Sequence, residues 1–407
     1  MKFLTRGVVL AVSSGVAMTA AAQPRACTRP PARTFQAGET VVIKDPVKPP
    51  CTIVFTETGI ELKADTAKKV QAIAGAVVRG PDGRFYTSTG RGEITVWSPK
   101  GTVVKKIGAL GRGQGEFAPG NMSIMFDHAG RMYVRDGNGR WSIFSPSLTF
   151  VRTVSAQGMG SEARHSAFLD NGLFLTTGST VGRHDTFFHV FDFAKTETHM
   201  ISRKPNEPLA PEQGPAHVRS FGNVLTRETH LPPASLERLI SYTGGDTFWA
   251  GPPMSAGHGY EIELWKTDGT RLRTIRREAS WFPPGADSPP PPAVRGRPRP
   301  PTQVVTLQSD PSGLVYVGVF VPNDKWGPIA VNISPAEQQK KLDEMAELHV
   351  EVIDANAGVV LAESGPIRRS RALAEYALGF MTGTMGYRPA PLSVPAMRIV
   401  EYHLVSK

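Results

Sequence analysis

The stretch that decides the fold is Gly108–Phe144, which reads GALGRGQGEFAPGNMSIMFDHAGRMYVRDGNGRWSIF. It opens with a glycine-rich turn that ends in Gly-Glu-Phe and a proline, and then alternates short apolar runs with polar turns. The segment Asp127–Gly130 has the chemistry of a tight turn, because an Asp side chain caps the turn and Gly accepts a positive φ. Short β-rich runs on both sides of such turns predict an antiparallel meander of strands.

The same order of short apolar runs and polar turns recurs along the chain, which indicates a repeat. The first two intervals between the expected third strands are both 47 residues, and later intervals are longer and require insertions. Six such units predict an all-β fold over residues 52–407, namely a six-bladed β-propeller with four-stranded antiparallel blades. The third strand of each unit is expected to end near Trp97, Phe144, Phe191, Trp265, Ile353 and Tyr402.

The unit Gly108–Phe144 resembles the NHL-repeat consensus, with Gly-Glu-Phe-x-Pro, Asp-x-x-Gly, Tyr-Val-x-Asp and Asn-x-Arg in order. One unit matches well and the others are degenerate. The resemblance implies that the polar repeat residues make structural hydrogen bonds within and between blades. We therefore interpret the repeat positions as architecture and not as a reaction centre: Asp127, Gly130, Asp136, Asn138 and Arg140.

The two ends of the repeat region complement each other. The last unit runs out just after its third strand, whereas Thr52–Leu62 is strand-like and precedes the first unit. We expect this early segment to supply the outer strand of the last blade. Such a closure joins the chain ends and removes an exposed sheet edge.

Three stretches do not fit blades and are expected to be insertions, at about residues 200–234, 282–302 and 324–348. The second contains a four-proline run and should be extended or disordered. The third contains Ser334–Glu337, which has the form of a capping box and predicts one short helix to about Leu348. This helix could be a lid over a ligand or a cover for an otherwise exposed surface.

Residues 1–22 read as a secretory signal peptide, with a basic start, an apolar run over Gly7–Met18 and small residues before cleavage near Ala22. The mature protein is then expected to be secreted or periplasmic. A membrane anchor is the competing interpretation, but the run is shorter than a spanning helix. A lipid anchor on Cys27 is another alternative. No later segment is long and apolar enough to span a bilayer.

Residues 23–51 form a proline-rich N-terminal arm that contains both cysteines, Cys27 and Cys51. In an oxidising compartment such a pair predicts a disulfide, and two free thiols are the alternative. The formal net charge of +10 is scattered, with local concentrations such as Arg271–Arg277. A basic balance can indicate nucleic-acid binding, but export argues against that partner. We expect solvated arginines and a monomer.

No recognisable catalytic motif is present, so the sequence does not identify catalytic residues. The closely spaced pair His184 and His189 is interpreted as ordinary strand residues. The favoured function is a binding scaffold for a peptide, a glycan or an envelope protein. The alternative, implied by relatives of NHL proteins, is a lactonase- or esterase-like hydrolase or a lyase with calcium or zinc in the channel. Whether the chain is an enzyme stays open, because fold does not imply function.

Overall fold

Short strands separated by tight turns make up nearly all of the chain that the computed structural model describes. The segments outside the description are the first 25 residues and several of the connections between strands. The structure describes residues 26–63, 65, 70, 77–88, 90–120, 122–155, 166–177, 186–194, 218–223, 237–242, 244–253, 259–282, 301–327, 333–334, 337, 340–341, 344–368, 385–389 and 396–407.

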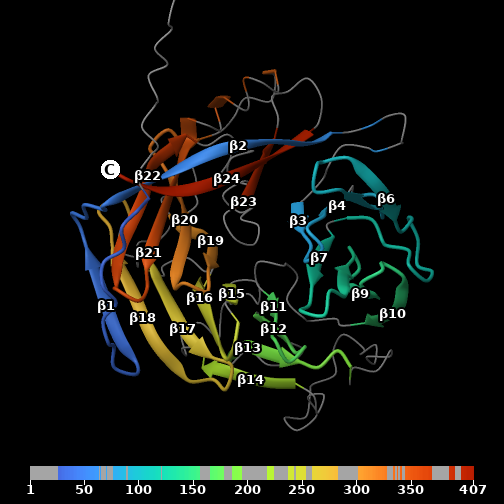
Figure 1. Ribbon diagram of the computed structural model, residues 1–407, viewed down its shortest axis with the longest axis horizontal. Coiled ribbons are helices and arrows are strands. Elements are labelled where there is room, and N and C mark those ends of the chain that lie inside the picture. Colours follow the sequence, from blue (N-terminus) through green and yellow to red (C-terminus); the bar gives the residue numbers. More distant parts are fainter. Residues whose placement is uncertain are drawn as a thin grey trace, which may run out of the picture.

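Three sheets have four antiparallel strands each and follow one another around a central axis in chain order (Figure 1). This arrangement is a β-propeller. The first sheet contains β3 (Val77–Arg79), β4 (Phe85–Ser88), β5 (Ile94–Trp97) and β6 (Val103–Ile107); the second contains β7 (Ser123–Phe126), β8 (Met132–Arg135), β9 (Arg140–Phe144) and β10 (Phe150–Ser155); the third contains β11 (Ser166–Phe168), β12 (Phe174–Thr177), β13 (Thr186–Phe191) and β14 (Val218–Asn223).

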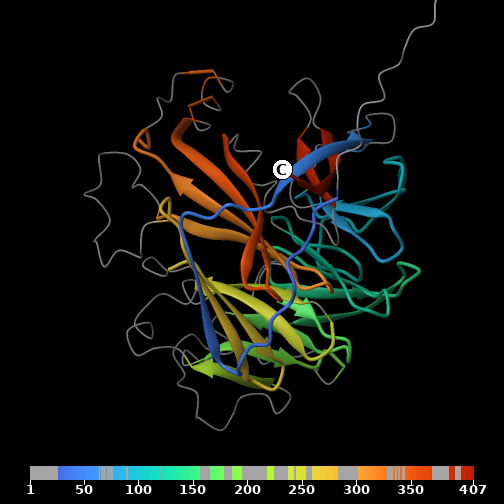
Figure 2. The same ribbon diagram turned by 60° about the vertical axis from the view of Figure 1, so that its left-hand side comes forward.

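The fourth sheet has a fifth strand that comes from the N-terminal arm. Its blade consists of β15 (Arg238–Tyr242), β16 (Thr247–Pro253), β17 (Glu261–Lys266) and β18 (Arg271–Glu278). Strand β1 (Glu39–Lys44) pairs in parallel with β18. The turned view in Figure 2 shows this blue strand beside the yellow outer strand of the blade.

The fifth sheet has seven strands and joins the two ends of the chain. One half is β19 (Gln303–Ser309), β20 (Leu314–Pro322), β21 (Ala346–Asp354) and β22 (Val359–Arg368). The other half is β2 (Cys51–Lys63), β24 (Ala396–Ser406) and β23 (Met385–Pro389). The halves are connected because β2 pairs with β24 along most of its length and with β22 at Cys51 and Thr52.

The prediction of six separate four-stranded blades is therefore wrong. The described strands form five sheets, because β2 bonds to β22 as well as to β24 and so merges the last two expected units into one sheet. The strand order within the units was predicted well. Strands β5, β9 and β13 end at Trp97, Phe144 and Phe191 as expected, and the pairing of β2 with β24 confirms the predicted closing strand.

Two further expectations differ from the structure. Ser334 and Glu337 make the reciprocal capping contacts, since the Glu337 amide donates to Ser334 Oγ at 3.2 Å and Ser334 Oγ donates to the Glu337 carboxylate at 2.9 Å. The described residues nevertheless contain no complete helix, and Leu348, its expected last residue, is buried in β21. Strand β14 lies inside the segment 200–234 that we expected to be an insertion, because β13 needs an outer partner.

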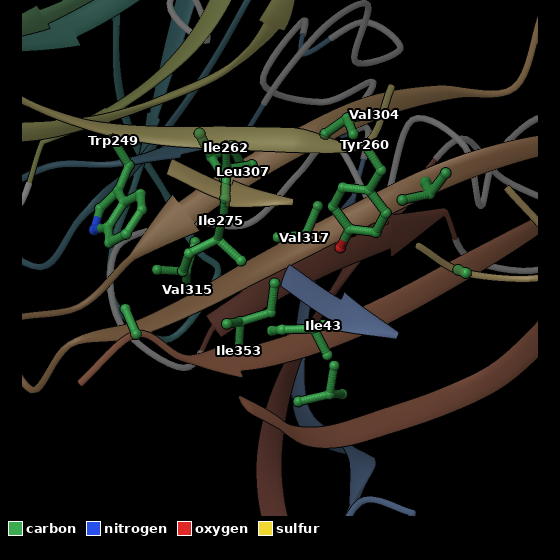
Figure 3. Packing of buried hydrophobic residues seen from close by; sticks show 14 of the residues in the cluster. Ile43, Trp249, Tyr260, Ile262, Ile275, Val304, Leu307, Val315, Val317 and Ile353 are labelled. Atoms are coloured by element: carbon green, nitrogen blue, oxygen red, sulfur yellow. The ribbon is translucent and has the colours of Figure 1, made fainter. Parts of the chain in front are cut away.

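The hydrophobic core is divided into clusters that fill the interfaces between neighbouring sheets. In the largest, Trp249, Ile262 and Ile275 of the fourth sheet pack near residues of the fifth sheet, as Figure 3 shows. From the arm strand, Ile43 completes this cluster. Along the described chain, no helix is long and apolar enough to cross a membrane.

Candidate functional site

The fourth and fifth sheets meet along a seam. At one end of this seam lie the strand ends that are joined by the longest connections of the two sheets. Strands β16 and β20 end there, β17 and β21 begin there, and β18 leads from there into β19. The antiparallel pairing places all of these strand ends at one edge of the propeller. We call this edge the insertion face.

An ionic group, here called the seam cluster, closes the insertion-face end of the seam; its members Arg277, Glu351 and Tyr260 are buried, Asp45 is half-buried and Ser280 is exposed. It consists of Asp45, Tyr260, Arg277, Ser280 and Glu351. The Arg277 guanidinium lies between two carboxylates, with Nη2 at 2.5 Å from Asp45 Oδ1 and at 3.1 Å from Glu351 Oε1. The Ser280 amide and hydroxyl donate to Asp45 at 2.6 and 2.8 Å. One arginine from β18 thereby connects the arm, the fourth sheet and the fifth sheet.

Burial and charge pairing oppose each other in the seam cluster. Burial raises the pKa of Glu351, and the hydrogen bonds and charge of Arg277 counter only part of that effect. Burial also opposes ionisation of Asp45, but the bonds from Ser280 and Arg277 are stronger and hold the pKa of Asp45 below its usual value. Removal of one partner from a buried ion pair of this kind strongly destabilises the fold, because the other charge is left buried without compensation.

The Tyr260 hydroxyl is the polar atom of the cluster that remains without a partner of good geometry. Tyr260 is 1% exposed, and its hydroxyl has no hydrogen-bond partner among the described residues. Burial, and next to it the charge of Glu351, raise the pKa of this hydroxyl well above its usual value. Tyr260 therefore stays protonated and packs mainly through its ring against Phe282.

A stacked aromatic pair lies beside the seam cluster. The rings of Trp281 and His349 are 4.3 Å apart and nearly parallel, and both side chains are only partly buried. Burial lowers the pKa of His349, and the neighbouring carboxylate of Glu347, at 3.6 Å, opposes this effect. We call Trp281, His349 and Glu347 the aromatic rim. It gives the insertion face a fixed, partly exposed apolar surface next to a carboxylate.

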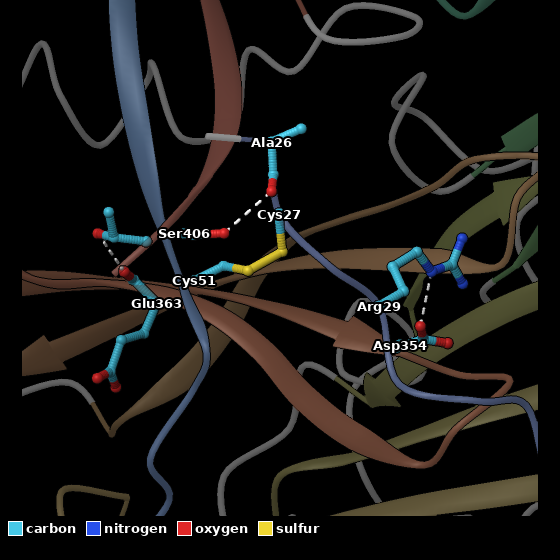
Figure 4. Close-up of a disulfide and its surroundings, with 8 residues drawn as sticks. Ala26, Cys27, Arg29, Cys51, Asp354, Glu363 and Ser406 are labelled. Carbon is cyan, nitrogen blue, oxygen red and sulfur yellow. Dashed lines mark hydrogen bonds and ion pairs between the residues drawn. A yellow bond between two sulfur atoms is a disulfide. The ribbon is translucent and has the colours of Figure 1, made fainter. Parts of the chain in front are cut away.

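The N-terminal arm is fastened at several points around the seam (Figure 4). Cys27 and Cys51 are joined by a disulfide with 5.7 Å between their Cα atoms. The Arg29 Nε donates to Asp354 at 2.7 Å, and Ser406 Oγ donates to the Ala26 carbonyl at 2.9 Å. The arm thus bonds to the end of β21 and to β24.

The predicted repeat residues lie in the second sheet, in two groups. Asp127 accepts hydrogen bonds from the Arg131 amide at 2.8 Å and from the Tyr133 hydroxyl at 3.1 Å, and Gly130 has a φ of 78°. Asp127 thereby fixes the turn between β7 and β8, and none of these contacts involves the seam cluster.

The second group of repeat residues anchors the glycine-rich loop. The fully buried Asp136 accepts from the amides of Ala118 and Asn138 and from Arg140 Nε, all at 3.0 to 3.1 Å. Arg140 also donates to the carbonyls of Arg112 and Glu116 at 2.6 and 2.7 Å. Among the histidines discussed above, His189 is fully buried in β13, and His184 lies outside the described residues.

Arg271 and Arg276 of β18, expected to be solvated, are about half exposed and are also ion-paired, whereas Arg277 is buried and Arg273 donates to the Ala355 carbonyl. Arg271 contacts Glu263 at 3.1 Å, and Arg276 contacts Glu261 at 2.5 Å. A weak signal for these two pairs was present in the sequence, because Glu261 and Glu263 lie at alternate positions on the preceding strand. The site that the sequence did not predict, the seam cluster, needed Asp45 and Glu351, which are far apart in the chain.

No group of three or more His, Cys, Asp or Glu side chains is placed to hold a metal ion in the part of the chain that the structure describes. The seam carboxylates are both engaged by Arg277.

Comparison with known proteins supports the architecture. No protein-family model and no curated protein matches the chain. The chain is similar to the crystal structure of a Bacteroides fragilis protein provisionally named an exported protein, with 12% identity, a TM-score of 0.51 and coverage of 90% of this chain and 100% of that one. It is also similar to the C-terminal WD40 domain of Sif2, with 10% identity, a TM-score of 0.41 and coverage of 93% and 99%. At these identities the first likeness shows the fold alone, and the second is too distant to carry an argument.

Proposed function

We propose that this protein is an exported binding scaffold that uses its insertion face to hold a peptide segment of an envelope protein. The observation that carries the proposal is the aromatic rim, where Trp281 and His349 are stacked, partly exposed and adjacent to Glu347. Aromatic side chains are enriched at the centres of protein interfaces, where rigid apolar area favours binding. The chain's repeats are proposed to be NHL-like, with the last two units fused into one sheet.

The rigidity of the rim supports a binding role. His349 and Glu351 lie two residues apart on β21, so the buried bonds of Arg277 to Glu351 hold the strand that carries His349 and Glu347. Trp281 lies in the turn after β18, where the neighbouring Ser280 is bonded to Asp45. Sites on strands with locked neighbours are more exact than sites on loops. A partner would therefore meet a surface that loses little conformational entropy on binding.

The test is a selection of displayed peptides on the mature, oxidised protein, followed by measurement of Kd for the selected sequences. We expect Trp281→Ala to weaken binding by roughly tenfold or more, as at a typical interface hot spot. Phe55→Ala is the matched control, because Phe55 is an aromatic residue with 44% exposure on β2, which β22 separates from β21. Equal affinity of the Trp281 variant and the wild type would refute the use of this face.

Elemental analysis of the same preparation tests the competing enzyme hypothesis. Stoichiometric calcium or zinc that persists through dialysis, together with loss of turnover on its removal, would replace the scaffold proposal. Export is tested separately by the N-terminal sequence of the mature protein, for which the proposed cleavage near Ala22 predicts a start at about Gln23.

A further inference from the structure

The outer strands of four sheets share a local irregularity in strand pairing that the sequence does not predict. In each, an extra residue is inserted into the outer strand where it pairs with the third strand, forming a β-bulge, and β22 has a second shift of register farther along. The inserted residue is apolar in all four strands: Val104 in β6, Val151 in β10, Leu272 in β18 and Leu361 in β22.

In two of these sheets the chain adds a further strand of its own beside the bulge. Strand β1 joins β18 and strand β2 joins β22, and both additions are parallel. Each pairing begins at the first residue after the bulge, since Glu39 lies opposite Arg273 and Cys51 lies opposite Ala362. The protein therefore uses the post-bulge edge twice as an acceptor for an extended segment.

The first sheet presents the same edge without an added strand. Among the residues that the structure describes, β6 pairs only with β5. The bulged Val104 is 46% exposed, whereas Leu361, at the equivalent place under β2, is completely buried. The first residue after the bulge is Lys105, which is exposed and cationic, as Arg273 is cationic on β18.

We propose that the outer edge of β6 binds an extended segment of a partner protein by parallel strand addition, with an acidic residue opposite Lys105 and β-branched residues after it. The chain's own arm provides the template, because Glu39 lies opposite Arg273 in the parallel register and is followed by Thr40–Ile43. The Glu39 carboxylate pairs with Arg33, and its charge also favours the Arg273 cation. In this mode main-chain hydrogen bonds supply affinity, and alternate side chains supply specificity. The exposed Val104 provides apolar area for the partner.

Bulges and lysines are also devices by which proteins protect sheet edges from unwanted pairing. In this chain they do not have that effect on β18. That strand carries a bulge at Leu272 and cationic residues at Arg271 and Arg273, and it nevertheless pairs with β1 over six residues. The same features on β6 are therefore compatible with strand addition.

This surface goes beyond the proposed function, because it lies on the rim of the first sheet and not at the seam of the fourth and fifth. The probe is a labelled synthetic peptide, AGETVVIKD, with the sequence of residues 37–45. In the oxidised protein the arm itself occupies the β18 edge, so added peptide reports on edges that remain open. We expect binding in the micromolar range, roughly 10–100 μM.

Two charge variants make the test specific. Lys105→Glu places a like charge opposite the peptide's glutamate and should weaken binding by about tenfold, whereas Lys105→Arg should preserve it. The matched control is Lys100→Glu, which makes the same charge change in the turn before β6. Hydrogen exchange should show slower amides in Val103–Ile107 when the peptide is bound. Thermal melts of all variants establish that they are folded.

Several outcomes would overturn the proposal. These are the absence of binding at about 1 mM peptide, an equal loss in the Lys100 control, or protection that appears only on β18 after displacement of the arm. Self-association of the protein through β6, removed by Lys105→Glu, would show that the edge accepts a second copy and not a partner's segment.

Discussion

Replacing both Cys27 and Cys51 with alanine would open the loop that fastens the N-terminal arm, and the cost can be worked from the structure. The two residues are separated by 24 positions. A cross-link of this span removes about 11.6 cal/mol/K from the unfolded chain, which is about 3.4 kcal/mol at 25 °C. A fold of roughly 300–400 residues has an unfolding entropy of about 0.6–0.8 kcal/mol/K. The melting temperature should therefore fall by roughly 4–6 °C.

The assay is urea denaturation of the oxidised wild type, the reduced wild type and the double alanine variant. We expect the last two to agree within about 1 kcal/mol, because both lose the same constraint on the unfolded state. Strand β1 should remain paired in the variant, since Val41 and Ile43 stay buried in the largest core cluster. Hydrogen exchange of the β1 amides measures this directly.

A reduced protein as stable as the oxidised one would refute this reasoning, because the unfolded-state constraint would then contribute nothing. Loss of β1 protection would refute it in another way. The disulfide would then act by holding the arm in place, and the entropy of the unfolded chain would be a minor part of its effect.

Three further predictions concern the seam and the turns. Arg277→Met should lower the free energy of unfolding by about 3–5 kcal/mol, because two carboxylates lose their cation, whereas Arg276→Met, at an exposed pair, should cost less than about 1 kcal/mol by the same denaturation assay. Gly92→Ala should cost at least about 1 kcal/mol more than Gly59→Ala: both glycines have a φ of +78°, but a Cβ at Gly92 would lie 2.8 Å from neighbouring backbone and one at Gly59 would contact nothing; equal costs would contradict the packing argument. Burial raises the pKa of Asp45, but its hydrogen bonds outweigh burial and the pKa is lowered. The carboxylate therefore stabilises the fold above the ordinary carboxyl pKa of about 3.9, and this contribution is lost as pH falls through the lowered pKa. Denaturation curves of Asp45→Asn should therefore show a shallower loss of stability than the wild type between about pH 5 and pH 2.

The order of strands and turns within each unit was predictable because it depends on local chemistry. The turn at Asp127–Gly130 is specified by a capping carboxylate and a glycine with positive φ, and both act within a few residues. The closing pair β2 and β24 was also predictable, since each end of the repeat region lacked what the other had. The number of separate sheets was not, because it depends on only two pairings, of Cys51 and Thr52 with β22.

The seam cluster was beyond sequence reasoning for a related reason. Its carboxylates come from the arm and from β21, and Arg277 comes from β18. The sequence predicts that Arg277 is exposed to solvent, because it shows a cluster of arginines on β18 and only a weak alternation of acidic residues on the strand before it. Only the parallel pairing of β1 with β18 places Asp45 beside it.

The pairing of β2 with β24 also orders events in time. A chain is synthesised from its N-terminus, so β2 emerges early and its partner β24, which ends at Ser406, emerges after all of the other described strands. Until then, β2 lacks its principal partner, and the ring of sheets cannot be completed. Closure of the propeller is therefore delayed until β24 has been synthesised, whereas sheets whose strands are neighbours in the sequence can form before it.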